Sequence, residues 1–82
     1  MIIDLTRVRQ GESGIIEEIQ GGLVALHKIQ SIGLRPGKKI KKVSSHFLCG
    51  PQTVKVGHMQ VAIGFGMAKK ILIKVERRSE HK

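Results

Sequence analysis

The sequence predicts a mainly β protein: a small barrel of about five short strands, with one α-helix in its N-terminal third and a helical turn before the last strand. Its 82 residues are enough for one small domain. Glycines and prolines divide the chain into short segments. Several of these alternate apolar and polar residues, as half-buried strands do. A closed barrel is the favoured arrangement for such strands, because closure leaves no exposed sheet edge.

The first predicted strand covers residues 15–19 and is bounded by glycines. Gly11 and Gly14 bracket a turn before it, and Gly21-Gly22 interrupt the chain after it. Glycine is favoured at such positions because it adopts backbone angles that are strained for other residues.

A helix is predicted over residues 23–32. Its apolar residues recur at helical spacing and form one stripe: Ala25, Leu26, Ile29 and Ile32. Gly33 is placed to cap the C-terminal end, and Pro36 prevents the helix from continuing. We expect the stripe to pack on the barrel.

The chain after Pro36 predicts the remaining strands and ends in a polar tail. Four further strands are expected over residues 38–45, 53–56, 59–63 and 71–75. The first of them is basic, with Ile40 and Val43 as its apolar anchors, and residues 64–69 form a single helical turn. A Src-homology-3-like (SH3-like) barrel fits this order of elements. We expect one domain over residues 1–76 and a polar tail over residues 77–82.

Net positive charge is the strongest signal in the composition. The formal net charge is +9 and the isoelectric point is about 10.4, which indicates an acidic partner. A dense basic stretch is formed by Arg35, Lys38, Lys39, Lys41 and Lys42. Strand alternation places Lys39 and Lys41 on one face. Three interpretations stay open: a solvated strand edge, a surface for an acidic protein, and a surface for nucleic acid. Nucleic acid is the least favoured, since aromatic content is only 2% and single-strand readers stack bases on aromatic rings.

An apolar loop, Phe47-Leu48-Cys49, lies between two predicted strands. Its tip either folds back onto the core or docks a partner. Cys49 is the single cysteine, so no disulfide forms within the chain, and a reducing cytosol is the simpler environment. The longest apolar run, residues 61–68, is far shorter than the roughly 20 residues of a membrane span. The N-terminus has no signal-peptide pattern.

The sequence shows no catalytic set, and we expect no enzyme activity and no cofactor. Glu17 and Glu18 are adjacent carboxylates, which in a regular strand point to opposite faces and cannot act as a pair. His46, Cys49 and His58 are a weak alternative as metal ligands. Their spacing does not match the paired ligands of a structural zinc site, so we expect no metal site and no tight binding of ferrous iron.

Three segments of the chain stand out by their order and spacing: LHKIQSIGLRPG at residues 26–37, GPQTVKV at residues 50–56 and VAIGFGMAKKILIKV at residues 61–75. Together they resemble the FeoA family of bacterial ferrous-iron uptake. The resemblance covers about residues 1–76 and implies an SH3-like fold. It also implies a cytoplasmic, non-enzymatic accessory protein that docks on the cytosolic part of the membrane GTPase transporter FeoB and so lies at the inner membrane through this partner.

The residues proposed for partner binding combine charge and apolar area: Lys39, Lys41, Phe47, Leu48 and Phe65. At Phe65 many similar proteins carry a basic residue, so docking here is expected to be more apolar. The same barrel resembles a domain of iron-dependent repressors, although the chain lacks their DNA-binding and dimerisation segments. A basic nucleic-acid-binding barrel and a regulatory module of the repressor kind are the alternative functions.

Overall fold

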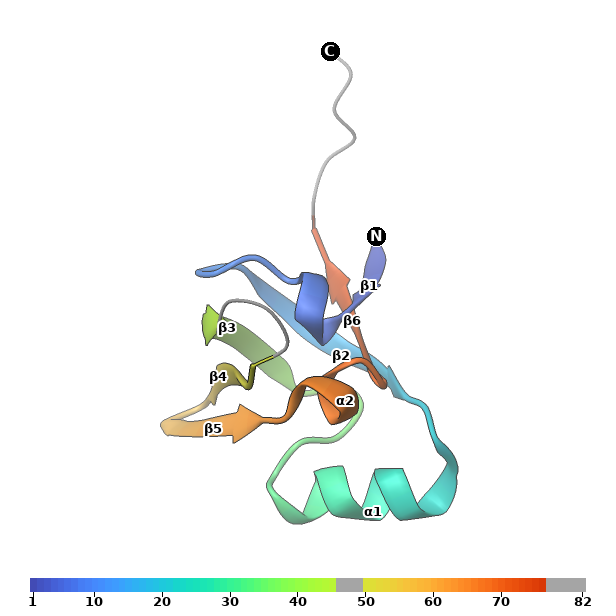
Figure 1. Cartoon of the computed structure of the whole chain (residues 1–82). Coiled ribbons are helices and arrows are strands. Elements are labelled where there is room, and N and C mark those ends of the chain that lie inside the picture. Colours follow the sequence, from blue (N-terminus) through green and yellow to red (C-terminus); the bar gives the residue numbers. More distant parts are fainter. Residues whose placement is uncertain (46–49, 77–82) are drawn as a thin grey trace.

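The computed structural model has the mainly β architecture that the sequence predicts, with an antiparallel six-stranded sheet (Figure 1). It describes residues 1–45 and 50–76. The strands are β1 (Ile2–Asp4), β2 (Ser13–Ile19), β3 (Lys39–Ser45), β4 (Gln52–Val56), β5 (Met59–Ile63) and β6 (Ile71–Val75). The helices are the 3-10 helix η1 (Leu5–Arg7) and the α-helices α1 (Gly22–Ser31) and α2 (Phe65–Ala68).

The strands follow the order β1-β6-β2-β3-β4-β5, so the first and the last strand of the sequence are neighbours in the sheet. β1 pairs with β6, with Ile3 opposite Ile73. Helix α1 lies at the opposite end of the molecule from the N-terminus (Figure 1). β1 and η1 were not predicted from the sequence, because three residues are too few to show strand alternation.

Two register shifts bend the sheet, as β-bulges do. One falls between Ile16 and Glu18 in the pairing of β2 with β6, and the other falls between Lys42 and Ser44 in the pairing of β3 with β4. The first corrects the expectation that Glu17 and Glu18 point to opposite faces. The bulge interrupts strict alternation, and both carboxylates are exposed.

Gly14 is a second correction, since it lies inside β2 rather than in a turn. It is buried where β2 approaches β6 closely. A Cβ atom added at Gly14 would lie 2.5 Å from the Cγ2 atom of Ile73 and 2.8 Å from the carbonyl oxygen of Lys74. This glycine is therefore required by close packing and not by a turn.

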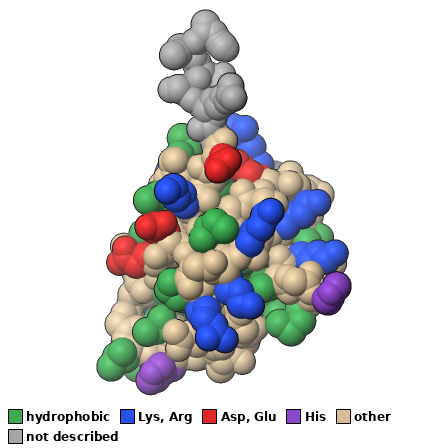
Figure 2. Space-filling view, turned by 180° about the vertical axis from the view of Figure 1, so that it is seen from behind, with side chains coloured by type: hydrophobic (Ala, Val, Ile, Leu, Met, Phe, Trp, Pro, Cys, Tyr) green, Lys and Arg blue, Asp and Glu red, His purple; other side chains and the backbone are tan. Residues whose placement is uncertain are grey.

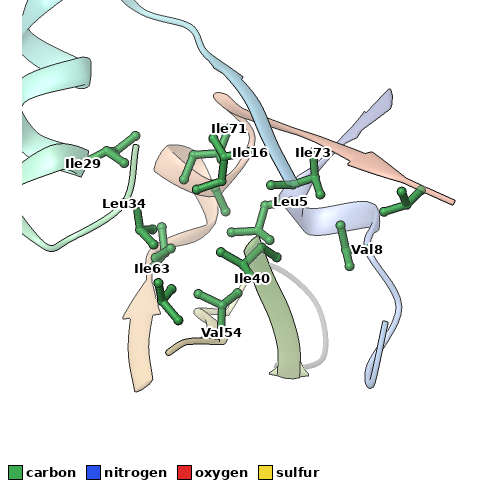
Figure 3. Packing of buried hydrophobic residues seen from close by; sticks show 13 residues of the cluster. Leu5, Val8, Ile16, Ile29, Leu34, Ile40, Val54, Ile63, Ile71 and Ile73 are labelled. Atoms are coloured by element: carbon green, nitrogen blue, oxygen red, sulfur yellow. The ribbon is translucent and has the colours of Figure 1, made fainter. Parts of the chain in front are cut away.

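The core draws apolar side chains from all three helices and five of the strands (Figure 3). It contains Leu5, Val8, Ile16, Ile29, Leu34, Ile40, Val54, Val56, Ile63, Ala68, Ile71, Ile73 and Val75. Of the two anchors predicted for β3, Ile40 is fully buried and Val43 is half-buried. Met67 packs against the cluster, as a core residue would.

Helix α1 ends as the sequence predicts, although its apolar stripe is shorter. Gly33 has φ +95° and donates its N–H to the Gln30 carbonyl, while Leu34 donates to the Ile29 carbonyl. This is the Schellman arrangement. Ile32, predicted to be buried, is 39% exposed, whereas Ile29 and Leu34 are fully buried. The chain turns at Gly33, so Leu34 and not Ile32 continues the apolar contact (Figure 3).

Candidate partner-binding surface

Four lysines share the outer side of the sheet, and we refer to them as the lysine face. They are Lys39 and Lys41 from β3, Lys55 from β4 and Lys74 from β6, and all four are exposed. Cross-strand pairing brings them together. Ile15 of β2 lies opposite both Lys39 and Lys74, so these two lysines flank an apolar side chain that is 38% exposed.

Lys41 and Lys55 are directly opposite each other in the β3–β4 pair. Like charges in this position repel and destabilise a sheet. Within residues 1–45 and 50–76, no ion pair is formed by either lysine. Among these residues the repulsion is therefore not offset by a paired carboxylate, and an anionic partner would relieve it.

Two shallow hollows adjoin on the lysine face and share Ser13 and Lys39. The larger, about 530 Å³, is lined by Ser13, Gly14, Ile15, Lys39, Lys74 and Glu76. The smaller, about 390 Å³, extends toward Lys41, Lys55 and Gly57. Together they form a basic depression across β6, β2, β3 and β4.

Basic side chains are spread widely over the molecule rather than concentrated in one spot. On the face shown in Figure 2, Lys and Arg side chains are interspersed with hydrophobic ones, while the acidic side chains lie in the upper half. The lysine face is therefore distinguished by its like-charged pair and its hollows, and not by charge alone.

Lys42 does not belong to this surface, which corrects the basic stretch predicted from the sequence. Its side chain is fully buried, and its ammonium donates hydrogen bonds to the carbonyl oxygens of Leu5 at 2.8 Å and Val8 at 2.9 Å. Burial lowers the pKa of the Lys42 ammonium below its ordinary value, while the nearby Asp4 and Glu12 carboxylates act in the opposite direction. Lys42 is a structural residue.

Phe65, the aromatic residue proposed for docking, begins α2 and is half-buried. The ammonium of Lys69 lies 5.6 Å from the centre of its ring, within the range of a cation–π contact. Phe65 lines neither hollow. The structure therefore does not bring it together with Lys39 and Lys41.

The other proposed residues are only partly within the described chain. His46, Phe47, Leu48 and Cys49 lie outside the described residues, so their roles stay predictions. His58 is exposed in the turn between β4 and β5. Within residues 1–45 and 50–76, no group of three or more His, Cys, Asp or Glu residues is arranged to hold a metal ion.

Lys55 and Lys74 were not identified from the sequence, although a signal existed. In VKV at residues 54–56 and IKV at residues 73–75, alternation places each lysine on the face opposite its apolar neighbours. That these faces adjoin Lys39 and Lys41 depends on the strand order. Among the described helices, none has the length and apolar character to cross a membrane.

Comparisons with known proteins agree on one family. The family model described as "FeoA domain" matches residues 3–75. A Methanocaldococcus jannaschii protein, described as a candidate Fe(2+) transport protein A, is 30% identical over 69 residues, which are 84% of this chain and 82% of that protein. A crystal structure of an iron uptake regulatory protein, FeoA, is 35% identical, with a TM-score of 0.82 and coverage of 90% of this chain and 96% of that one.

A third similarity concerns the fold alone. The crystal structure of Stenotrophomonas maltophilia FeoA complexed with zinc, described as a prokaryotic SH3 domain protein, has a TM-score of 0.74 and 18% identity. It covers 88% of this chain and 89% of that one. The SH3-like fold predicted from the order of elements is thereby confirmed, but the strand order ends in two edge strands, β1 and β5, in place of the closure that was expected.

Proposed function

Because this chain belongs to the FeoA domain family, a family of non-catalytic accessory domains in ferrous iron transport, we propose that it docks on the cytosolic part of a FeoB-like membrane GTPase transporter and supports its assembly or activity. The lysine face carries the proposal. It joins four exposed lysines, an exposed isoleucine and two hollows on one side of the sheet.

Two further observations support a protein partner. Among the described residues, no aromatic side chain lines either hollow, whereas single-strand nucleic-acid readers stack bases on aromatic rings. The Stenotrophomonas maltophilia protein is described as a candidate activating factor of bacterial ferrous iron transport. An adaptor of this kind works in the cytoplasm and lies at the inner membrane through its partner. Phe47, Leu48 and Phe65 are proposed to add apolar contacts.

Binding kinetics with the transporter's purified cytosolic region test this proposal. The double variant Lys39→Glu/Lys41→Glu should associate more slowly and show a weaker dependence on salt, because charge steers the encounter. The variant Lys28→Glu/Lys70→Glu changes the net charge equally at exposed positions outside the hollows and serves as the matched control. Equal slowing of the two variants would assign the effect to net charge and contradict docking at the lysine face.

A further inference from the structure

Within the part of the chain that the structure describes, strand β5 is an edge of the sheet with no strand on its outer side. It is the last strand in the sheet order, and its five residues, Met59–Ile63, include no charge and no proline. Natural edge strands are usually protected by lysines, prolines, bulges or shortness, because free backbone groups pair with other chains. The opposite edge, β1, follows that rule, with three residues and an aspartate.

The hairpin register shows which backbone groups of β5 face outward. Val56 and Met59 are paired across a two-residue turn, so they exchange hydrogen bonds with each other. Hydrogen-bonded and non-hydrogen-bonded pairs then alternate along the hairpin. Gln60 and Ala62 fall in the non-hydrogen-bonded pairs, so their N–H and C=O groups point away from β4. Both residues are exposed and can pair with an added strand.

An apolar anchor lies beside one end of this edge. Met59 is 48% exposed and Ile32, at the end of α1, is 39% exposed. The Cε atom of Met59 lies 3.0 Å from where a Cβ atom at Gly33 would stand. Met59 therefore rests against the end of α1 and leaves apolar area for a partner side chain.

The other side of the edge leads onto the lysine face. Gln60 lies opposite Lys55, which in turn lies opposite Lys41. A strand added beside β5 would place alternate side chains next to Gln60. Its backbone would lie about 10 Å from that of β4, a distance that a lysine side chain on β4 and a glutamate side chain on the added strand can span together. Its chemistry should therefore be acidic. A second copy of this chain is disfavoured, since each copy has a net charge of +9 and like-charged chains repel.

We propose that the free edge of β5 accepts an extended acidic segment of a partner protein as an additional antiparallel or parallel strand. The backbone groups of Gln60 and Ala62 supply the hydrogen bonds, and Lys55 selects for acidic side chains. Strand addition of this kind derives affinity from the main chain and specificity from alternate side chains. The proposal shares Lys55 with the lysine face, but its hydrogen-bonding groups lie on the free edge of β5, and its test does not involve the transporter.

A short synthetic peptide of alternating threonine and glutamate is the probe. At about 1 mM peptide, a site with a Kd in the millimolar range is about half occupied. We expect amide hydrogen exchange, measured by NMR, to slow at Gln60 and Ala62. The amide of Val61 already pairs with β4 and should change little. Lys55→Glu should weaken binding about tenfold, and added salt should weaken binding to the wild type.

Ala62→Pro is the decisive variant. Because the Ala62 N–H faces the free edge, proline there removes no bond to β4, and edge strands tolerate it. The variant should stay folded and lose peptide binding, while Ala62→Thr, which keeps the N–H group, should bind as the wild type does. If Ala62→Pro does not fold, the exchange pattern of the wild type with peptide decides instead.

Four results would overturn the proposal. They are no binding of the peptide, equal binding by folded Ala62→Pro, equal binding of an alternating threonine–lysine peptide, and protection of other amides only. Single-stranded polyuridine that protects the same amides in place of the peptide would assign the surface to nucleic acid. Self-association that protects them as protein concentration rises would assign the edge to a second copy of the chain.

Discussion

At the scale of single residues, Lys42 is buried by the alternation of its strand, and its ammonium is satisfied by hydrogen bonds. Strict alternation in β3 puts Lys39 and Lys41 outside and Ile40 and Lys42 inside, and the observed burial follows this pattern. A buried ammonium is costly unless it is hydrogen-bonded. Here its partners are the carbonyls of Leu5 and Val8, so Lys42 ties the η1 segment to the sheet.

Replacing Lys42 should destabilise the fold. Lys42→Met keeps most of the side-chain volume but leaves two buried carbonyl oxygens without their donor. We expect a loss of about 1–3 kcal/mol in the free energy of unfolding, as for other unsatisfied buried groups. Urea denaturation measures it, with Lys39→Met as the exposed control, expected to change stability by no more than about 0.5 kcal/mol. Equal stability of the two variants would contradict the role of Lys42 in holding the η1 segment to the sheet through its hydrogen bonds.

The lowered pKa of Lys42 predicts a dependence on pH. Between its folded-state pKa and its ordinary value of 10.5, the unfolded chain binds more protons than the folded one, so stability rises with pH in that window. The contribution of Lys42 deprotonation to the free energy of unfolding is complete above pH 10.5 and is lost as pH falls through the folded-state pKa. The stability of wild type minus that of Lys42→Met should increase as pH approaches 10.5, measured by denaturation at a series of pH values. A flat difference would show that the pKa is not lowered.

At the scale of elements, helix α1 and its C-terminal turn give different burial to two isoleucines, Ile29 and Ile32, that have equivalent places in the sequence pattern. Ile29→Ala should cost about 2–4 kcal/mol, as large-to-small changes in a core do. Ile32→Ala should cost about 1 kcal/mol or less, because Ile32 is partly exposed. Chemical denaturation of the two variants provides the comparison, and each is the other's control. Equal costs would contradict the packing of α1 described above.

Gly14→Ala tests the close approach of β2 to β6. The added methyl group would meet Ile73 and the backbone of Lys74 at less than van der Waals separation, and overpacking of this kind typically costs about 1–3 kcal/mol. Gly66→Ala is the matched control, because nothing lies within 4 Å of its added Cβ atom and alanine favours its helix. Thermal denaturation should show a lower Tm only for the variant at position 14.

At the scale of the whole molecule, positive charge opposes stability while it favours binding. In the cross-strand pair Lys41–Lys55, the same two charges repel each other in the sheet and would attract an acidic partner. Lys41→Glu should create an opposite-charge pair and raise the free energy of unfolding by about 0.2–1 kcal/mol, while weakening binding to the transporter's cytosolic region. Denaturation at low salt and binding kinetics measure the two effects. A variant that is less stable, or that binds as well as wild type, would contradict a functional reason for the repulsion.

Local patterns in the sequence located seven of the nine described elements, with limits within one or two residues of those observed. Residues 59–63 and 71–75 were predicted with the observed limits, because their alternation reflects the repeat of the strand itself. The end of α1 could also be predicted from the sequence, since Gly33 adopts a left-handed conformation that few other residues tolerate. These features depend on the backbone preferences of a few neighbouring residues, and the order of elements and three sequence segments were sufficient to indicate the family.

Tertiary structure alone decided which side chains are buried and which surfaces adjoin. Leu34 replaces Ile32 in the core because the chain reverses at Gly33, and β1 exists because β6 pairs with it. The lysine face and the free edge of β5 both depend on the strand order, which joins residues distant in the chain. Alternation tells which residues of one strand share a face, but hydrogen bonding between strands determines which faces meet, and that energy is not contained in any short segment.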